Sequence, residues 1–319
     1  MEANTHRPRW KTLLAFAIIY FVWGSTFLAI RIGVREVPPF LFAAIRFTIA
    51  GLALYGWMIA HGERSPSRRQ WTSAFLLALL IFVLDYGLLF WAEQRVPSGV
   101  AAVMMATIPA FMALAEIILL RTQILTASLA VALTIGIGGV AVLMSHSLSL
   151  SWGSLGGAPI DRAGAVALII AAISWSVASA LTRKLPLPPS KVMSSGAQML
   201  AGGVLLAVTA GALGEFRGFQ PLAVSRGAWL ALLYLIVAGS IIGFTAYVWL
   251  IHHESPTKVG TYAYVNPVVA VLLGYFLGGE TLGLRTILGT LFVLISVVVI
   301  ITTRAKKPAA APRAVEDIG

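Results

Sequence analysis

The stretch "WTSAFLLALLIFVLDYGLLFW", residues 71–91, is apolar along its length except for two hydroxyl residues at its start and one carboxylate, Asp85. About 20 apolar residues are enough to cross the hydrocarbon core of a bilayer as one helix. Residues 229–249, "WLALLYLIVAGSIIGFTAYVW", repeat the spacing of the flanking tryptophans and carry Gly243 at the position of Asp85. The sequence therefore predicts membrane helices and an internal repeat.

Ten apolar stretches of sufficient length are present in the 319-residue chain, of which 59% is hydrophobic and only 11% charged. They are approximately 12–30, 40–60, 71–91, 97–120, 125–145, 163–182, 192–213, 228–251, 256–279 and 283–303. The stretches are continuously apolar and do not alternate, which disfavours a transmembrane β-barrel. We predict an all-α integral membrane fold of ten transmembrane helices.

The distribution of basic residues predicts the orientation of the chain. With the N-terminus inside, fifteen of the 23 lysines and arginines fall in cytoplasmic segments and seven on the opposite side. This bias is the one expected of cytoplasmic loops, so both termini are predicted to be cytoplasmic. No convincing cleavage site follows the first apolar run, which we expect to stay as a membrane span. The Pro/Ala-rich residues 304–319 are expected to form a disordered cytoplasmic tail.

The internal repeat extends over most of the chain. "WGSTFLAIR" at residues 23–31 corresponds to "WSVASALTR" at 175–183 at an offset of 152, and the same offset pairs Arg46 with Gln198 and Gly51 with Gly203. Farther along the chain the offset becomes 158, which pairs the two tryptophans of each quoted stretch and also Pro109 with Pro267.

The repeat predicts two halves of five spans, residues 1–145 and 163–303, joined by a loop at 146–162. Because five is odd, each half enters the membrane from the opposite side, which gives inverted-topology repeats. Two such halves can exchange conformations, so that the cavity between them opens first to one side and then to the other. The repeat therefore favours transport by alternating access.

The composition argues against several other function classes. The chain has no cysteine, which excludes disulfides, thiolate metal sites and iron–sulfur clusters. Its five histidines are expected in terminal or loop segments, so no metal centre and no cofactor are predicted. The net charge of +11 comes from basic residues scattered between apolar runs, which favours anionic lipid headgroups over nucleic acid as a partner. No phosphate-binding GxxxxGK[ST] loop is present.

Several stretches resemble one transporter family. They are "FVWGSTFLAIR" from Phe21, "PPFLFAAIRFTIAG" from Pro38, "PSGVAAVMMATIPAFMALAE" from Pro97, "SSGAQMLAGG" from Ser194 and "SPTKVGTYAYVNPVVAVLLGYFLGGETL" from Ser255. In their order and spacing the chain resembles the ten-helix EamA-like branch of the drug/metabolite transporter superfamily. The resemblance implies a carrier of the bacterial inner membrane that exports amino acids or other small metabolites.

The chain departs from the family pattern at two places. The acidic residue that follows the proline in such repeats is present in the second half as Glu280, whereas the first half has Thr122 at the equivalent position. Ser296 stands where the last helix of the family commonly has glycine. We expect both departures to affect helix-end packing rather than the cavity.

Asp85 and Arg46 are the charged candidates for a site. A carboxylate within a span usually faces a cavity, pairs with another charge or relays protons. At 1.5 Å per residue, Asp85 and Arg46 both lie roughly 9 Å below the outer boundary, so we hypothesise a buried ion pair. Asp85 is then a structural counter-ion, a substrate anchor or a proton site. Arg46 is a donor that captures a substrate carboxylate, or else it extends to the outer interface.

Further candidates come from polar and aromatic residues at mid-span. Aromatic faces with one donor suit stacking against aromatic or amphipathic substrates, although a packing role is equally open. The predicted substrate-binding residues, besides the charged pair, are Trp23, Trp175, Gln198, Tyr262, Tyr264 and Asn266. The matched prolines Pro109 and Pro267 are predicted to kink gating helices, or else to form static kinks that shape the bundle. Glu116 is interpreted as a solvated helix end.

These observations together predict a secondary active transporter, an exporter of amino acids or other small metabolites, which is not an enzyme. Its coupling is to protons or to substrate exchange, and its partners are a small-molecule substrate, protons and the lipid bilayer. A monomer suffices, because two fused halves supply their own symmetry. The alternatives are a membrane enzyme acting on a lipid-linked substrate, for which clustered acids and histidines are missing, and a passive channel.

Overall fold

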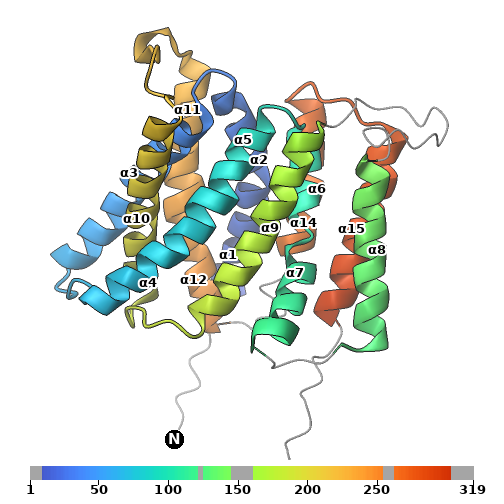
Figure 1. The fold of residues 1–319 in the computed structure, drawn as a ribbon, viewed down its shortest axis with the longest axis horizontal. Helices are drawn as coiled ribbons and strands as arrows, with labels where there is room; N and C mark the ends of the chain where they lie inside the picture. The colour runs from blue at the N-terminus through green and yellow to red at the C-terminus, as the bar shows by residue number, and fades with distance from the viewer. Residues whose placement is uncertain (1–8, 121–124, 145–160, 254–261, 303–319) are drawn as a thin grey trace, which may run out of the picture.

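The structure is a computed structural model that describes residues 9–120, 125–144, 161–253 and 262–302. Within these ranges the secondary structure is helical, as the sequence predicts. The elements are α1 (Arg9–Ala17), η1 (Ile18–Val22), α2 (Trp23–Val34), α3 (Pro39–Ala60), α4 (Arg68–Ala78), η2 (Leu79–Gly87), α5 (Leu88–Glu93), α6 (Ser98–Met105), α7 (Ile108–Ala115), η3 (Glu116–Leu120), α8 (Ala127–Met144), α9 (Arg162–Thr182), α10 (Lys191–Ala212), η4 (Pro221–Ala223), α11 (Arg226–Tyr234), η5 (Leu235–Ile242), α12 (Gly243–His253), α14 (Tyr262–Phe276) and α15 (Leu284–Thr302). Figure 1 shows them as one bundle.

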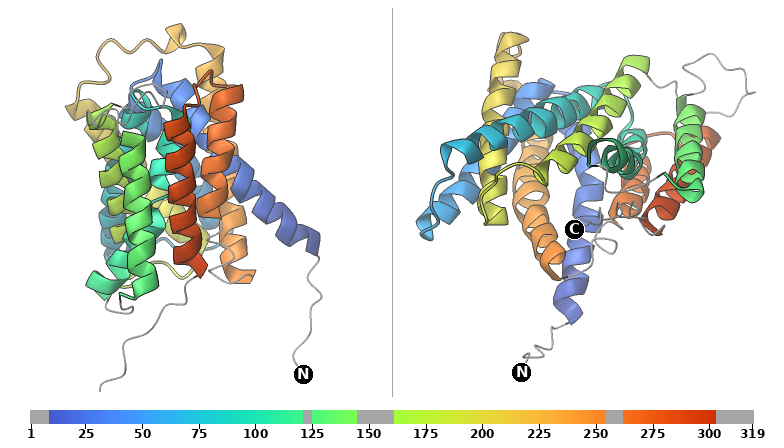
Figure 2. Two further views of the ribbon diagram at one scale, coloured as in Figure 1. Left: turned by 90° about the vertical axis from the view of Figure 1, so that its right-hand side faces the viewer. Right: turned by 60° about the horizontal axis from the view of Figure 1, so that its bottom comes forward.

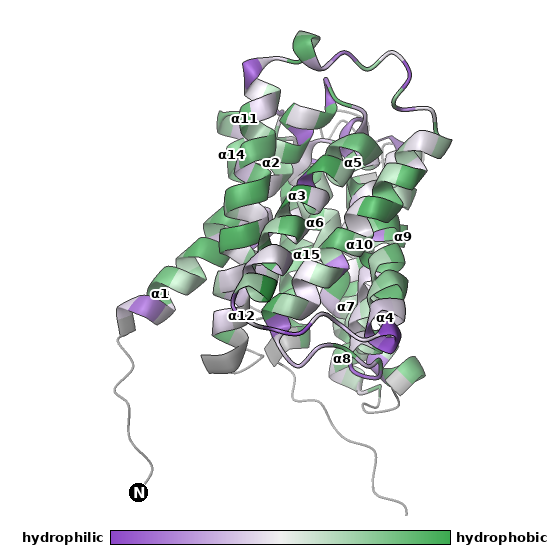
Figure 3. Ribbon diagram, turned by 90° about the vertical axis from the view of Figure 1, so that its left-hand side faces the viewer, coloured by the Kyte–Doolittle hydropathy of each residue, from purple (hydrophilic) through white to green (hydrophobic). Residues whose placement is uncertain are grey.

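The apolar composition of the spans requires a helical backbone. In lipid each N–H and C=O group must be satisfied within the protein, and a helix does so within one segment. Seven helical stretches among the described residues are long and apolar enough to cross a membrane, and three shorter apolar helices accompany them, at 127–143, 265–276 and 284–300. Figure 3 shows hydrophobic residues along the helices, with hydrophilic residues gathered in the connections at the two ends. The chain is therefore a multi-pass membrane protein.

Short polar sequences determine where several helices begin. Ser67 and Gln70 form a reciprocal capping box before α4, with Ser67 N donating to Gln70 Oε1 at 2.8 Å. Asp161 accepts the N–H of Gly164 at 2.7 Å at the start of α9, and a proline is the first residue of α3. These residues lie between the apolar runs of the sequence. The helix boundaries therefore follow from side-chain caps and from the proline.

The helices pair across the bundle rather than along the chain. α3 packs along α10, α8 packs along α15, and α6 contacts α14. α2 lies against α11 and α14, whereas α9 lies against η2 and α7. Figures 1 and 2 place α8 and α15 side by side at one edge of the bundle. We call residues 9–144 the first half and residues 161–302 the second half, and each of these contacts joins one half to the other.

Glycines allow α3 and α10 to approach at backbone distance. A Cβ atom on Gly51 would lie 2.5 Å from the backbone nitrogen of Leu200, and one on Gly203 would lie 2.7 Å from that of Thr48. Contact this close is open only to glycine, because any side chain would overlap the facing backbone. The two glycines that the sequence pairs at an offset of 152 thus serve the same contact from opposite sides.

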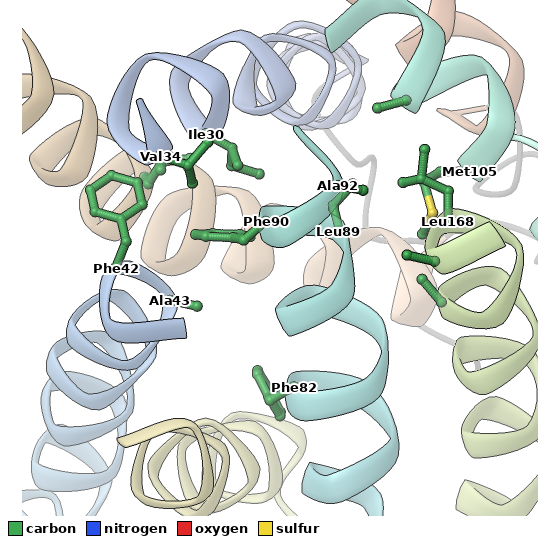
Figure 4. Close-up of a cluster of buried hydrophobic side chains, with 14 of the residues drawn as sticks. Ile30, Val34, Phe42, Ala43, Phe82, Leu89, Phe90, Ala92, Met105 and Leu168 are labelled. Atoms are coloured by element: carbon green, nitrogen blue, oxygen red, sulfur yellow. The ribbon is translucent and has the colours of Figure 1, made fainter. Parts of the chain in front are cut away.

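A hydrophobic cluster closes one end of the bundle. We call the end where α2 stops and α3 starts the outer end, and the opposite end the inner end. Below the outer end, Phe42 and Phe90 pack with their ring centroids 5.8 Å apart, and Ile30 and Leu89 are also buried there. Figure 4 shows these side chains directed into the space between α2, α3 and α5.

Candidate functional site

A cavity of about 700 Å³ lies between the two halves. Near the outer end it is lined by Ile30, Leu89 and Ala102, and at the inner end it reaches Glu116 and Arg183. Its walls come from both halves and are mostly apolar and aromatic. A concave, largely apolar space with a few polar groups is the usual form of a small-molecule site.

The structure brings the residues predicted from the sequence together at this cavity. The lining includes Trp23, Arg46, Asp85, Pro109, Trp175, Gln198, Tyr262, Asn266 and Pro267. The side chain of Tyr264 lies outside the described part of the structure. Common placement does not establish the role of each residue, so substrate binding and gating stay predictions for all of them.

Arg46 is held at the cavity wall by the second half. Its side chain is 3% exposed, and its Nε donates to the hydroxyl of Ser240 at 3.1 Å. The guanidinium lies 4.7 Å from the ring centroid of Phe47 and 5.5 Å from that of Tyr86, at cation–π distance. Its Nη1 has no hydrogen-bond partner among the described residues, which leaves one buried donor available to a ligand.

Asp85 is likewise buried but separate from Arg46. It is 2% exposed, and its Oδ1 has no hydrogen-bond partner among the described residues. No nitrogen of Arg46 lies within 4.0 Å of an Asp85 carboxylate oxygen, so the hypothesis of a buried ion pair is wrong for this conformation. The physical reason is that Ser240 and the aromatic rings already hold the guanidinium.

The repeat position of Asp85 has a packing explanation. Trp23 donates its indole N–H to the carbonyl of Gly239 at 3.1 Å, and a Cβ atom on Gly243 would lie 2.5 Å from that indole nitrogen. A side chain at position 243 would therefore displace Trp23. The tryptophan also meets Tyr247 and Tyr262, each with ring centroids 5.2 Å apart.

The two stretches that contain these positions share an irregular backbone. η2 and η5 are π-helical segments within the third and eighth predicted spans. At the offset of 158, η2 corresponds to residues 237–245, which overlap η5. π-helical turns are rare and occur frequently at functional sites. Asp85 lies in the first segment, and Ser240 lies in the second.

The matched prolines lie in different local structures. Pro109 is in the first turn of α7, after α6 has ended and residues 106–107 have formed a turn. Pro267 lies inside α14, where it cannot donate to the carbonyl of Ala263. The preceding Asn266 is 8% exposed, and with its amide turned to donate it contacts the carbonyls of Ile19 and Tyr20 at 3.2 and 3.0 Å.

Sequence reasoning missed two features of the cavity. Ser240, 2% exposed, is the residue that positions Arg46. The sequence feature that could have identified it is the one that identified Asp85, a polar residue inside an apolar span. Glu116, interpreted from the sequence as a solvated helix end, is 24% exposed at the inner end, but it also lines the cavity and pairs with Arg183 at 2.8 Å, which the sequence did not indicate.

Two glutamates at the outer end connect the halves outside the spans. Glu36 accepts the N–H and hydroxyl of Ser225, each at 2.6 Å, and these bonds hold the pKa of Glu36 below its ordinary value. Glu215 accepts the N–H of Leu41 at 2.8 Å. Burial raises the pKa of Glu215, against the opposing effect of that hydrogen bond. Both carboxylates cap the first turn of a helix that belongs to the other half.

The described residues contain no group of three or more histidines, aspartates or glutamates placed to hold a metal ion. The polar groups of the cavity are instead those that hydrogen-bond an organic solute: a guanidinium, a carboxylate, an amide and indole or phenol donors. A multi-pass helical bundle with such a cavity between two halves has the architecture of a membrane transporter.

Comparison with known proteins agrees with this class. The model of the EamA-like transporter family matches residues 10–145 and again residues 162–302. The chain belongs to the EamA-like transporter family. The two matches correspond to the two halves described above.

Two relatives, one of them named a transporter, match over most of the chain. The chain is 39% identical over 270 residues to "Uncharacterized inner membrane transporter YedA" of Escherichia coli (strain K12), covering 84% of this chain and 83% of that protein. It is 26% identical to "Protein PecM" of Dickeya dadantii (strain 3937), covering 88% of each chain. A chain of known crystal structure superposes with a TM-score of 0.58 at 22% identity, over 92% of this chain and 96% of that one, which shows the shared fold.

Proposed function

We propose that this protein is a secondary active transporter that exports amino acids or other small metabolites across the bacterial inner membrane by alternating access. Energy comes from a proton gradient or from substrate exchange. The proposal places the substrate in the cavity between the halves, against Arg46 and Asp85. Membership of a transporter family favours this function over an enzyme acting on a lipid-linked substrate.

The pairing of helices supports an inverted repeat and hence alternating access. α3 contacts α10 and α8 contacts α15, and in each of these pairs the two helices are repeat equivalents, while α6 contacts α14 within the equivalent fourth and ninth predicted spans. At the level of whole spans, the contact of α2 with α11 joins the first and eighth predicted spans, and that of α9 with η2 joins the sixth and third, which are their repeat equivalents. A two-fold relation between the halves requires this pattern, and the odd number of predicted spans makes the relation an inverted one.

The observation that carries the substrate proposal is the separation of two opposite charges in one cavity. Arg46 has a buried donor and Asp85 a buried acceptor without partners among the described residues, and they do not neutralise each other. A buried charged group without a partner is costly. A ligand that hydrogen-bonds to both groups therefore gains the most binding free energy. An amino acid presents a carboxylate to Arg46 and an ammonium to Asp85.

The aromatic walls indicate where the rest of the substrate lies. Trp23, Tyr247 and Tyr262 form one cluster of rings on the lining, and Tyr86 meets Trp175 at a centroid distance of 6.1 Å on the other side. Such faces favour apolar or aromatic side chains. Sugar phosphates are disfavoured, because Arg46 and Arg183 are the only basic side chains on the lining that the structure describes.

Competition in reconstituted vesicles tests the proposal. A labelled amino acid, chosen from a panel by counterflow, is competed with tryptophan, tryptamine and indole-3-propionate, which differ in carrying both charges or one. A charge-assisted hydrogen bond contributes about 1.5–3 kcal/mol, so each single-charge analogue should compete about 10- to 150-fold less well. Equal competition by all three would refute the recognition of two charges.

Variants assign each charge to its partner. Arg46→Gln should remove the preference for tryptophan over tryptamine, and Asp85→Asn should remove its preference over indole-3-propionate. The control variants Arg217→Gln and Glu63→Gln change exposed residues away from the cavity and should keep the wild-type order. A pH gradient that drives wild type but not Asp85→Asn, while exchange survives in both, would make Asp85 the proton site.

A further inference from the structure

Two arginines that the repeat makes equivalent lie at opposite ends of the bundle. Arg31 ends the motif at residues 23–31, and Arg183 ends the matching motif at 175–183. Each forms an ion pair with a glutamate of the other half, Arg31 with Glu280 and Arg183 with Glu116. The inference drawn from these pairs rests on the alternating access proposed above.

The outer pair is tightly enclosed. Arg31 Nε lies 3.3 Å from Glu280 Oε1, and the two side chains are 17% and 7% exposed. The same carboxylate accepts the backbone N–H and the hydroxyl of Ser98 at 2.6 and 2.7 Å and the N–H of Gly99 at 3.1 Å. Glu280 therefore caps α6 of the first half while it neutralises Arg31.

Arg31 also fixes the turn between α5 and α6. Its Nη1 donates to the carbonyls of Glu93, at 3.2 Å, and of Val96. Gln94 in the same turn donates to the carbonyl of Val34 at 3.0 Å. The end of α2 is thus bound to the turn above the cavity by side-chain to backbone contacts. The caps provided by Glu36 and Glu215 tie the halves together at the same end.

The inner pair is more exposed and lies on the cavity wall. Arg183 Nη1 is 2.8 Å from Glu116 Oε1, but the side chains are 58% and 24% exposed. Both residues line the cavity, whereas neither Arg31 nor Glu280 does. The cavity therefore extends to the inner pair and stops short of the outer pair.

The carboxylates of Glu116 and Glu280 occupy equivalent places in the two halves, although the two residues are not repeat equivalents. At the offset of 158, Glu116 corresponds to Gly274, not to Glu280. A Cβ atom on Gly274 would lie only 2.4 Å from Glu280 Oε2. The carboxylate of Glu280 folds back into the place that a side chain at 274 would take. Both halves thus set a carboxylate at the same repeat position, opposite the equivalent arginine.

We propose that Arg31–Glu280 and Arg183–Glu116 are the outer and inner gates of the transporter, and that the chain rests with the outer gate closed. Opening the outer end requires Glu280 to leave both Arg31 and the first turn of α6. Opening the inner end requires the separation of one partly exposed ion pair and of the exposed hydrogen bond from Lys184 Nζ to the Leu119 carbonyl, at 2.9 Å, and exposed contacts of this kind contribute little in water. The asymmetry of the two pairs therefore favours access from the inner end in the absence of substrate.

Cysteine labelling tests the proposal without transport, since the chain has no native cysteine. Thr26→Cys places a thiol on the cavity lining, at a residue 8% exposed. An impermeant maleimide is applied to intact cells and to inverted vesicles. Arg217→Cys, an exposed position at the outer end, identifies which side of the membrane that end faces. In the parent chain we expect faster labelling of Thr26→Cys from the inner side.

Neutralising the outer gate should change this result. Arg31→Gln and Glu280→Gln should each raise labelling from the outer side about tenfold, the factor given by about 1.4 kcal/mol. Arg183→Gln should not raise it. Arg35→Gln is the matched control, an exposed arginine one helical turn from Arg31. Unchanged labelling in the outer-gate variants, or an equal rise in Arg35→Gln, would overturn the proposal.

A second reporter separates opening from unfolding. Ala43→Cys lies at a fully buried position of α3 that does not line the cavity. It should stay unlabelled in the outer-gate variants, and parallel labelling there would mean unfolding and overturn the gate assignment. Labelling needs no substrate. A chain that labels as expected but shows no counterflow would therefore support the gate assignment while refuting the proposed transport.

Discussion

Replacement of Gly51 by alanine tests the backbone contact on which the two halves meet. The added Cβ would lie 2.5 Å from Leu200 N and 2.9 Å from its Cα, whereas ordinary contacts begin at 3.4 Å. The facing atoms are backbone, so α3 and α10 must separate rather than a side chain rotate. Overpacking of this kind costs about 1–3 kcal/mol, which we expect as a loss in the free energy of unfolding in mixed micelles.

Gly56→Ala on the same helix is the matched control. A Cβ there meets nothing within 4 Å, so Gly56→Ala should keep or raise the free energy of unfolding, by up to about 1 kcal/mol from helix propensity. Gly203→Ala should behave like Gly51→Ala. The double variant should lower the free energy of unfolding by less than the sum of the two single variants, because the helices separate only once. If Gly51→Ala were no less stable than Gly56→Ala, the close approach of α3 and α10 would be wrong.

Three further predictions concern the site and the outer end. Ser240→Ala should raise the half-saturating substrate concentration in counterflow about tenfold or more, because the Arg46 guanidinium loses its acceptor; Ser240→Thr should restore it. Trp23→Phe should lower the free energy of unfolding by about 0.5–1.5 kcal/mol, through loss of the bond to Gly239, while Trp57→Phe, on an exposed ring, should not. The pKa of Glu36 is lowered in the folded state, so its stabilisation is present above 4.5 and lost as the pH falls through the folded value. Unfolding midpoints at pH about 6 and about 3.5 should therefore differ less in Glu36→Gln than in wild type.

Much of the fold follows from local rules that a sequence displays. Long apolar runs must be helical in lipid, and the repeat pairs residues such as Gly51 and Gly203 that meet the same interface in the structure. The polar and aromatic residues at mid-span were also predictable as a group. In an apolar helix they stand out, and the structure gathers the described ones on one cavity.

The partners of the charged residues could not be predicted in the same way. Equal depth suggested that Arg46 binds Asp85, but depth does not give the direction in which a side chain points around its helix. The guanidinium turns toward Ser240 of the other half. Glu280 reaches Arg31 only because Gly274 leaves a space and the chain folds back over it. Such contacts depend on helix rotation and loop geometry, which residue spacing does not record.

Counterflow is the most direct test of the central claim, that a substrate binds in the cavity and is carried by alternating exposure. Sealed vesicles containing the wild-type protein are loaded with unlabelled substrate and diluted into a trace of the labelled compound, with no ion gradient imposed. A carrier predicts a transient accumulation of label above its equilibrium level, which Arg46→Gln should reduce. Entry that rises only to equilibrium, at the same rate with or without internal substrate, would identify a channel and contradict the account.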